Sequence, residues 1–262
     1  MNILVACEYS GVVREAFRRR GHNAWSCDLL PSDDDTDFHI QGDCMLAYRM
    51  KVPWSGDKWD MVIAHPPCTY LCSSGLHWNK RTPGRQEKTE DALRFVKSLL
   101  DLDCERIALE NPVGCISTRI RKYDQLVQPW MFGDDASKKT CLWLKGLPQL
   151  KPTKIVPPKG WGIVKYADEC LICDLCGEPY CEECEGHYAD CECIGPTQDD
   201  ATYKTIDGIE FATLEENPSK PVWANQTNSG QNKLGPSADR WKIRSKTYQG
   251  IADAMAKQWG II

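Results

Sequence analysis

The sequence predicts an α/β fold with helices on both faces of a mostly parallel sheet, followed by a small cysteine-rich module. Residues 1 to about 157 alternate short apolar runs with helical patterns, as β-α-β units do. This alternation stops after Pro148, in a stretch rich in proline and glycine. Seven of the 15 cysteines then fall between Cys170 and Cys193, which marks a separate module.

The predicted elements follow one another in a regular order. Short apolar runs indicate strands at 2–6, 23–27, 38–40, 59–64, 106–109 and 141–144. Apolar residues at helical spacing indicate helices at 11–20, 85–101 and 248–259. We therefore divide the chain into a sheet domain at 1–157, an insert at 158–238 and a C-terminal helix at 239–262 that returns to the sheet domain.

The bulk composition is that of an ordinary water-soluble protein. Hydrophobic residues make up 42% of the 262 residues, mean hydropathy is −0.48, and no apolar run approaches the ~20 residues of a membrane span. The chain begins on a predicted strand without a signal-peptide pattern, so we expect a cytoplasmic protein, with a monomer favoured. The eight cysteines outside the module suit a reducing compartment better than a disulfide framework.

The charge is unevenly distributed along the chain. A net charge of −5 argues mildly against nucleic-acid binding, but the electrostatic field of a cleft is local. Positive residues gather in four groups: Lys80, Arg81, Arg85 and Lys88; Arg119, Arg121 and Lys122; Lys138 and Lys139; Arg240, Lys242, Arg244 and Lys246. Each group is either a solvated loop or a contact for an acidic partner.

A tight turn follows the first predicted strand, and acidic residues follow the second and third. The turn is Cys7-Glu8-Tyr9-Ser10-Gly11, with one glycine and no GxGxxG pattern. Ligands of such sheets bind beyond the carboxyl ends of the strands. There Asp28 can accept from both hydroxyls of a ribose, and Asp43 can accept from an adenine amino group. These residues suit an adenosyl ligand without phosphates, such as S-adenosylmethionine, although each acid alone is also typical of a surface.

A cysteine and a glutamate follow two further strands. The run 59–64 leads into His65-Pro66-Pro67-Cys68, and the run 106–109 leads into Glu110-Asn111-Pro112. The proline pair gives a stiff, extended approach that can aim the Cys68 sulfur into a pocket. A thiol and a carboxyl group at strand ends suit covalent addition to a pyrimidine ring whose N3 is protonated. A buried structural thiol is the alternative interpretation.

These two segments resemble the Pro-Cys and Glu-Asn-Val motifs of the DNA (cytosine-5)-methyltransferases, in a compact divergent form found in bacteriophages. The turn at 7–11 takes the place of that family's first donor-binding loop, and Tyr248-Gln249-Gly250 resembles its final motif. The family's first loop is usually Phe-x-Gly-x-Gly, which this chain lacks. Its Gln-x-Arg-x-Arg motif is also not evident, and Lys138-Lys139-Thr140 stands where we expect it.

The resemblance implies a Rossmann-like methyltransferase sheet, S-adenosylmethionine as donor, and duplex DNA with a flipped cytosine as substrate. It implies that Cys68 attacks carbon 6 and that Asn111 anchors the backbone beside Cys68. Glu110 would hold or protonate N3, a role that a raised carboxyl pKa would help. The donor would lie against Cys7, Glu8, Tyr9, Ser10, Gly11, Asp28, Asp43, Pro66 and Gly250.

The cysteine-rich module has the spacing of a zinc site. Its eight soft ligands are Cys170, Cys173, Cys176, Cys181, Cys184, His187, Cys191 and Cys193, enough for one or two closed structural ions. In the resembled family this position holds the target-recognition domain, so we assign the insert to DNA contact. Candidate contacts to base edges or phosphate are Trp223, Asn225, Gln226, Asn228, Gln231 and Asn232.

Other functions stay open. Amino-methyltransferases that act on adenine N6 or cytosine N4 use an [Asp/Asn/Ser]-Pro-Pro-[aromatic] motif, which His65-Pro66-Pro67-Cys68 resembles except at its first and last positions. A zinc-bearing DNA-binding protein on a non-catalytic methyltransferase scaffold is the second alternative. An RNA substrate is a further variant.

Overall fold

The structure, a computed structural model, describes residues 1–163, 165–167, 170–172, 202–213, 220–237 and 240–261, with the backbone alone at 165–167 and 170–172. Two compact units share these residues. The first comprises 1–134, 138–153 and 237–262, and the second comprises 135–137 and 154–236. The first unit therefore contains both ends of the chain.

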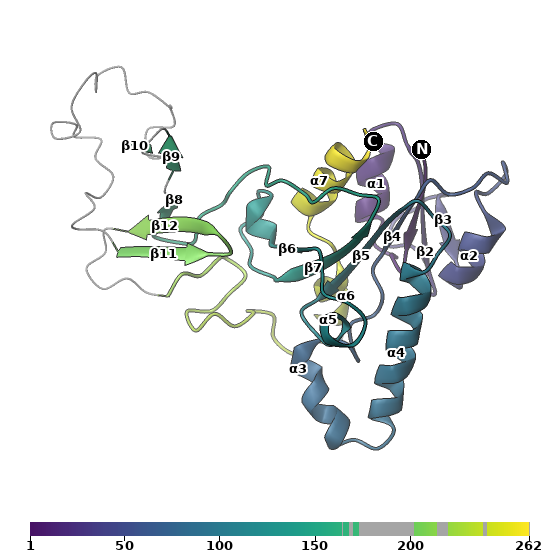
Figure 1. The fold of residues 1–262 in the computed structure, drawn as a ribbon, viewed down its shortest axis with the longest axis horizontal. Coiled ribbons are helices and arrows are strands. Elements are labelled where there is room, and N and C mark those ends of the chain that lie inside the picture. The colour runs from purple at the N-terminus through teal and green to yellow at the C-terminus, as the bar shows by residue number, and fades with distance from the viewer. Residues whose placement is uncertain (164, 168–169, 173–201, 214–219, 238–239, 262) are drawn as a thin grey trace. The chain divides into compact units, whose positions relative to one another are not determined.

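A seven-stranded sheet forms the centre of the first unit, with strand order β3-β2-β1-β4-β5-β7-β6 (Figure 1). Its strands are β1 (Asn2–Ala6), β2 (Asn23–Asp28), β3 (His39–Gln41), β4 (Met61–Ala64), β5 (Arg106–Pro112), β6 (Gln125–Val127) and β7 (Thr140–Lys145). The first five strands are parallel, while β7 runs antiparallel to both β5 and β6. The fold is thus α/β with a mostly parallel sheet and helices on both faces, as the sequence predicts.

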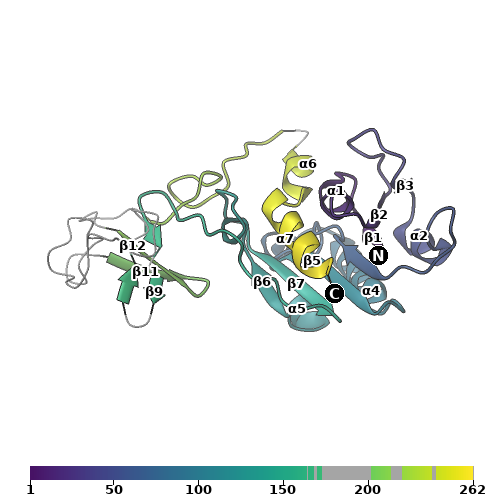
Figure 2. The ribbon, with the colours of Figure 1, turned by 90° about the horizontal axis from the view of Figure 1, so that it is seen from above.

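The helices of this unit are α1 (Val12–Arg18), α2 (Cys44–Met50), α3 (Ser73–Leu76), α4 (Arg85–Leu100), α5 (Ile116–Arg119), α6 (Arg240–Ser245) and α7 (Gln249–Trp259), with 3₁₀ turns η1 (His77–Lys80) and η2 (Pro129–Met131). Figure 2 shows α1 and α7 on one face of the sheet and α4 on the other. Side chains of alternate strand residues fill the two layers between helices and sheet. Leu4, Val62 and Ile107 pack in the layer that contains α2 and α4.

The strand order reverses direction between β1 and β4. The chain after β1 passes through α1 to β2, whereas the chain after β4 passes through α4, on the opposite face, to β5. A crevice forms at the carboxyl ends of two strands whose connections leave in opposite directions. The predicted turn at 7–11 and the predicted Cys68 segment both lie at this edge.

Sequence patterns explain where the helices of this edge begin. The Asp43 carboxylate accepts hydrogen bonds from the N–H groups of Met45 and Leu46, so it caps α2. Helix α1 has Gly11 at its N-cap with φ of 70°, a conformation that glycine adopts without strain. A carboxylate from outside this cap, Glu8, binds the free N–H groups of the first turn.

The described residues of the second unit form two small antiparallel sheets. Its strands are β8 (Gly162–Ile163), β9 (Lys165–Ala167), β10 (Cys170–Ile172), β11 (Thr202–Ile206) and β12 (Ile209–Thr213). The order is β11-β12-β8 in one sheet and β10-β9 in the other. Phe211 and Trp223 are buried and meet edge to face, with ring centroids 6.4 Å apart. Within the described part of the chain, none of the helices is long and apolar enough to cross a membrane.

Candidate active site

The Cys68 segment is held rigidly at the edge of the sheet. The N–H of His65 continues the β1–β4 ladder by donating to the carbonyl of Ala6 at 2.9 Å. After the two prolines, the carbonyl of Cys68 accepts from the N–H groups of Leu71 and Cys72, both at 3.0 Å. The loop therefore begins and ends in backbone hydrogen bonds, which fixes the position of Cys68.

Residues Glu110 and Asn111 lie near the end of β5, beside this loop. The Asn111 side chain is 1% exposed, and its Nδ2 donates to the carbonyl of Pro66 at 2.7 Å. This contact is a backbone anchor of the kind that the resemblance implies for Asn111. The buried Glu110 carboxylate lies 2.9 Å from His65 Nδ1 and also accepts from the Thr140 side chain.

The pKa of Glu110 is lowered in the folded protein, opposite to the raised value that a proton donor to N3 would favour. Burial alone would raise it, but the hydrogen bond from His65, the charge of Lys138 and the Thr140 contact together outweigh burial. Glu110 is therefore ionised at rest. The sequence interpretation did not include His65 as a partner of Glu110.

The Cys68 thiol is half-buried beside a second cysteine, Cys72. A hydrogen bond between the two sulfurs, burial, and the charges of Cys72 and Glu110 raise the pKa of Cys68 far above the ordinary thiol value, although Lys138 opposes this. The same sulfur contact, with Ser74 and the N–H of Gly75, lowers the pKa of Cys72 to about 5. At rest the shared proton thus lies on Cys68, and Cys72 is the thiolate.

A second buried carboxylate, Glu8, also interacts electrostatically with His65. Its oxygens accept from the N–H groups of Val13 and Arg14 at 2.7 and 3.2 Å, which satisfies the first turn of α1. Burial raises the pKa of Glu8, while the charge of His65 and these N–H groups act against the rise. The ends of β1, β4 and β5 therefore place Glu8, His65 and Glu110 in one buried group.

The predicted donor residues form a neighbouring group at the ends of β1, β2 and β3. The Cys7 sulfur lies 3.8 Å from that of Cys44, and Cys7 has a φ of 60°, which is uncommon for a residue with a side chain. Asp28 and Asp43 both act electrostatically on the Cys27 and Cys44 thiols, so the two acids share this edge. One oxygen of each acid accepts a local hydrogen bond. Asp28 accepts from the N–H of Leu30, and Asp43 accepts from the N–H of Met45 at the start of α2.

The other predicted donor residues have structural contacts of their own. The Tyr9 hydroxyl lies 3.0 Å from both the Lys242 carbonyl and the Ser245 hydroxyl, so it anchors α6. Ser10 is half-buried in the turn that leads to Gly11. Gly250 lies in the first turn of α7, where its N–H donates to Asp134 at 3.0 Å and an added Cβ would approach the Phe132 carbonyl to 2.0 Å. That packing alone requires glycine at position 250.

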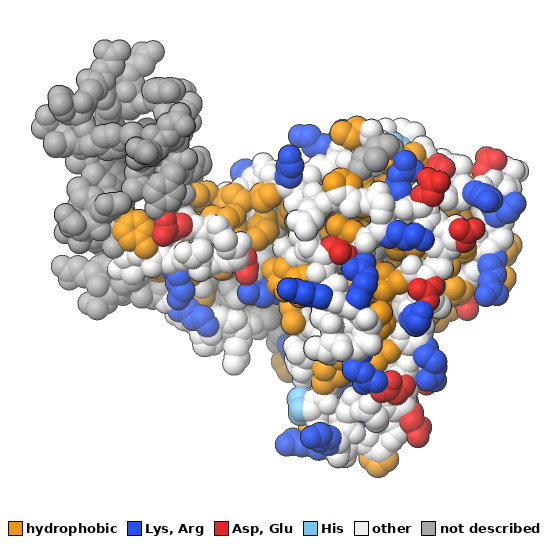
Figure 3. Space-filling model, in the orientation of Figure 1, with side chains coloured by type: hydrophobic (Ala, Val, Ile, Leu, Met, Phe, Trp, Pro, Cys, Tyr) orange, Lys and Arg blue, Asp and Glu red, His pale blue; other side chains and the backbone are white. Residues whose placement is uncertain are grey.

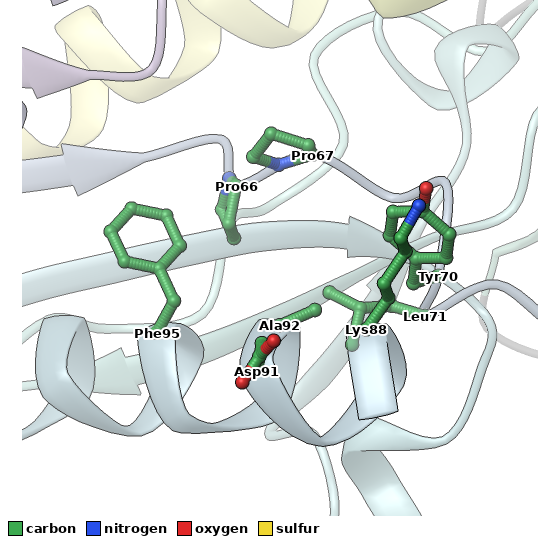
Figure 4. A pocket seen from close by; sticks show the side chains of 8 residues that line it. All are labelled: Pro66, Pro67, Tyr70, Leu71, Lys88, Asp91, Ala92 and Phe95. Atoms are coloured by element: carbon green, nitrogen blue, oxygen red, sulfur yellow. The ribbon is translucent and has the colours of Figure 1, made fainter. Parts of the chain in front are cut away.

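An apolar cavity of about 360 Å³ lies behind the loop, on the α4 side. Figure 4 shows its lining from the two prolines of the loop and from α4: Pro66, Pro67, Tyr70, Leu71, Lys88, Asp91, Ala92 and Phe95. Neither Cys68 nor Glu110 is among these residues. The cavity therefore separates the loop from α4 and does not contain the reactive groups.

The segment from α3 to the start of α4 carries basic and aromatic side chains. Trp78 is 47% exposed, with the Arg81 guanidinium 5.8 Å from its ring, and Arg85 lies 4.8 Å from the Tyr70 ring. Figure 3 shows Lys and Arg side chains gathered near the end of this segment. Such a combination suits contact with phosphates and bases.

The structure does not describe the side chains of the predicted zinc ligands. Of these eight residues only Cys170 is described, and only by its backbone. Among the residues that the structure does describe, no group of three or more His, Cys, Asp or Glu is placed to hold a metal ion. In the second unit, Trp223 donates to the Val156 carbonyl and Asn225 pairs with the backbone of Ser137. Gln226 binds the backbone of its own loop, so these three predicted DNA contacts have internal partners, whereas Asn228, Gln231 and Asn232 are exposed.

The sequence interpretation missed four residues of this site: His65, Cys72, Lys138 and Thr140. For His65 a signal existed, because a histidine directly before the proline pair occupies the end of a predicted strand. Lys138 and Thr140 were noted only because they stand where the Gln-x-Arg-x-Arg motif of the resembled family is expected. Cys72 reaches Cys68 because α3 begins there, and the sequence gives no clear sign of so short a helix.

Comparisons with known proteins add little. No protein-family model and no curated protein matches the chain. Among solved structures it is similar to one provisionally described as a DNA modification methyltransferase encoded within an E. coli prophage, with 16% identity and a TM-score of 0.40. The match covers 60% of this chain and 52% of that chain, about half of its length. A likeness this distant carries no argument about function.

Proposed function

We propose that the protein is a DNA cytosine-5 methyltransferase that works through a covalent Cys68 adduct. One observation carries the proposal: a hydrogen bond from Asn111 to Pro66 ties the Cys68 loop to β5, and Cys68 and the buried Glu110 act on each other electrostatically. A thiol and a carboxyl group so placed can add to C6 and donate a proton to N3 of one pyrimidine ring. The mostly parallel α/β sheet is consistent with this class of enzyme.

The residues at the donor edge fit S-adenosylmethionine by the chemistry of their side chains. Asp28 and Asp43 are hydrogen-bond acceptors that share one edge, and an adenosyl ligand presents hydroxyl and amino donors. We assign these two acids and the turn from Cys7 to Gly11 to the donor, which supplies an electrophilic methyl group for carbon 5.

Side chains of the protein carry out the remaining steps of the reaction. Cys68 loses its proton to solvent as its sulfur adds to C6 of the flipped cytosine, and the charge of Lys138 favours this loss. Glu110, after taking up a proton from solvent when the base binds, donates it to N3, so that negative charge does not accumulate on the ring. Loss of the C5 proton to solvent and departure of the Cys68 sulfur restore the aromatic ring and the enzyme.

A cation near Glu110 supports this assignment. The charge of Lys138 helps to lower the pKa of Glu110 and opposes the rise in the pKa of Cys68, and its Nζ donates to the Arg244 carbonyl at 3.1 Å. We assign Lys138 to the base carbonyl, where the resembled family has an arginine. The basic segment at Lys80 and Arg81 is assigned to DNA phosphates, and the insert with its zinc ligands to target recognition.

Product analysis tests the function. The protein is incubated with duplex DNA and S-adenosylmethionine labelled in the methyl group, and the DNA is then digested to nucleosides. We expect label in 5-methyldeoxycytidine, its loss in Cys68→Ser, and its retention in Cys104→Ser. The control is matched because the Cys104 thiol donates to backbone carbonyls, away from the site, as a serine hydroxyl can.

One observation favours a second function. The Cys68 thiol is protonated at rest, and an amino-methyltransferase needs no thiolate at this strand end. Label in N4-methyldeoxycytidine or N6-methyldeoxyadenosine, unchanged in Cys68→Ser, would establish that function instead. Transfer to RNA alone would keep the chemistry but change the substrate.

A further inference from the structure

A fully buried arginine, Arg14, packs against the turn that follows β1. Its side chain is 0% exposed, and a buried guanidinium needs a partner for each of its nitrogens. Arg14 Nε donates to the Glu15 carboxylate at 2.9 Å, and Nη1 donates to the Ser26 hydroxyl at 2.8 Å. Nη1 also donates to the Ser32 hydroxyl at 3.4 Å, and Nη2 forms an ion pair with Asp34. The partners thus come from α1, from β2 and from the loop after β2.

That loop, residues 29–38 between β2 and β3, is held against the same turn through the backbone of Tyr9. The carbonyl of Tyr9 accepts from the N–H of Asp33 at 2.9 Å and from the Ser32 hydroxyl at 3.3 Å. The loop starts directly after Asp28, at the end of β2. Its attachment to the turn therefore fixes the spacing between the turn and the Asp28 carboxylate.

The single glycine of the turn makes room for this arginine. A Cβ added at Gly11 would overlap Arg14 Nη2, and the φ of 70° separately favours glycine there. In dinucleotide-binding sheets the glycines of this turn let the backbone approach the ligand. Here a guanidinium fills the space beside the glycine. The turn has no GxGxxG pattern, and a buried side chain determines its shape instead.

We propose that Arg14 is a positioning residue for the methyl donor: by joining the turn at 7–11 to the loop at 29–38, it sets the spacing between that turn and Asp28. The inference rests on the proposed function, which assigns both to S-adenosylmethionine. Arg14 acts through these segments and not by contact, since its guanidinium nitrogens all have protein partners. A ligand that meets a preformed edge binds more tightly, because it does not have to order the edge itself.

The connection can be broken at its accessible end. The Asp34 side chain is 42% exposed, whereas a substitution of the buried Arg14 would open a space in the core. Partial burial would raise the pKa of Asp34, but hydrogen bonds from Arg14 and Ser32 lower it, so the carboxylate is ionised at neutral pH. Asp34→Ala removes this acceptor and releases the loop. Asp34→Asn keeps an oxygen that can accept from Arg14.

Calorimetric titration of the protein with S-adenosylmethionine, without DNA, tests the proposal. We expect the donor Kd to rise about 10-fold in Asp34→Ala and to stay within about threefold of wild type in Asp34→Asn. Glu90→Ala is the matched control, because it breaks an ion pair of similar exposure, 2.9 Å from Arg119 on α5. It should leave the donor Kd unchanged. A donor Kd in Asp34→Ala equal to that of Glu90→Ala, at similar urea midpoints, would overturn the proposal.

Steady-state methylation separates positioning of the donor from a general structural role. In Asp34→Ala we expect KM for S-adenosylmethionine to rise about 10-fold while kcat falls less than about threefold, since only donor binding is weakened. A fall in kcat with KM unchanged would contradict the assignment. If the wild-type protein binds the donor but methylates no cytosine, the proposed function fails while the calorimetric comparison still decides the role of Arg14. If the wild-type protein binds no donor, both fail.

Discussion

The side-chain amide of Asn111 donates a 2.7 Å hydrogen bond to the main-chain carbonyl of Pro66. This bond connects β5 to the loop after β4, two residues before Cys68. Because Asn111 is almost fully buried, water cannot replace the donor if it is lost. The position of the thiol relative to Glu110 therefore depends on one side chain.

Replacing this donor should loosen the loop. Asn111→Asp keeps the size of the side chain but faces a carbonyl oxygen with a carboxylate oxygen, which leaves a buried acceptor unpaired. We expect a loss of about 1–3 kcal/mol of unfolding free energy and a larger proportional loss of methyl transfer, measured by urea denaturation and product analysis. Asn23→Asp, at an exposed amide, is the control. An Asn111→Asp protein of unchanged stability would show that the anchor is not needed.

Gly250 should be essential for docking of α7. A Cβ at this position would lie 2.0 Å from the Phe132 carbonyl and 2.7 Å from an Asp134 carboxylate oxygen. We expect Gly250→Ala to lower the unfolding free energy by about 1–3 kcal/mol, because overpacking forces the backbone to shift. Gly235→Ala, where a Cβ meets open space, should leave the thermal midpoint nearly unchanged. A purely ligand-related role for Gly250 would instead weaken donor binding without changing stability.

The Cys72 thiol should react with iodoacetamide before Cys68 does. The sulfur contact with Cys68, the Ser74 hydroxyl at 3.3 Å and the N–H of Gly75 stabilise its thiolate and hold its pKa at about 5. Alkylation mapped by mass spectrometry, at a pH well below the ordinary thiol range, is expected at Cys72. In Cys68→Ala the hydrogen-bond donor is gone, and we expect slower alkylation of Cys72. Preferential labelling of Cys68 would reverse the assigned direction of the shared proton.

Glu110 should contribute to the loss of stability in acid. Its pKa is lower in the folded protein than in the unfolded chain, so its stabilising contribution is present above the ordinary carboxyl pKa of about 4.3 and is lost as pH falls through the lowered value. We expect urea midpoints of Glu110→Gln to fall less steeply with acidification than those of the wild type. Glu87→Gln, exposed on α4, is the control. Parallel pH profiles of wild type and Glu110→Gln would contradict the lowered pKa.

Much of the first unit could be predicted from sequence because its strands are parallel and buried on both faces. Such strands are short, nearly continuous apolar runs, and those at β1, β2, β4 and β5 matched the pattern closely. The antiparallel direction of β7 was not predicted, since local sequence does not specify the direction of pairing. Helices α2, α3 and α5 were not predicted, because at seven residues or fewer they are too short to show a clear helical period.

The candidate site could be predicted only in part, because local sequence shows where a strand ends but not which side chains meet in the fold. Cys68, Glu110, Asn111, Asp28 and Asp43 could be proposed because each follows or ends an apolar run. The role of His65 and the protonation states depend on distances between β1, β4 and β5 that no local pattern contains. The side-chain partners of Trp223 and Gln226 likewise depend on contacts within the folded second unit.

Covalent trapping tests the central claim most directly. The protein is incubated with S-adenosylmethionine carrying a tritiated methyl group and duplex DNA containing 5-fluorocytosine, and the products are separated on a denaturing gel. Fluorine at carbon 5 cannot leave as a proton does, so the adduct of a cytosine-5 enzyme persists. We predict a labelled protein–DNA band that is absent in Cys68→Ser. Methyl transfer to unmodified DNA by both proteins, without any trapped band, would contradict the account.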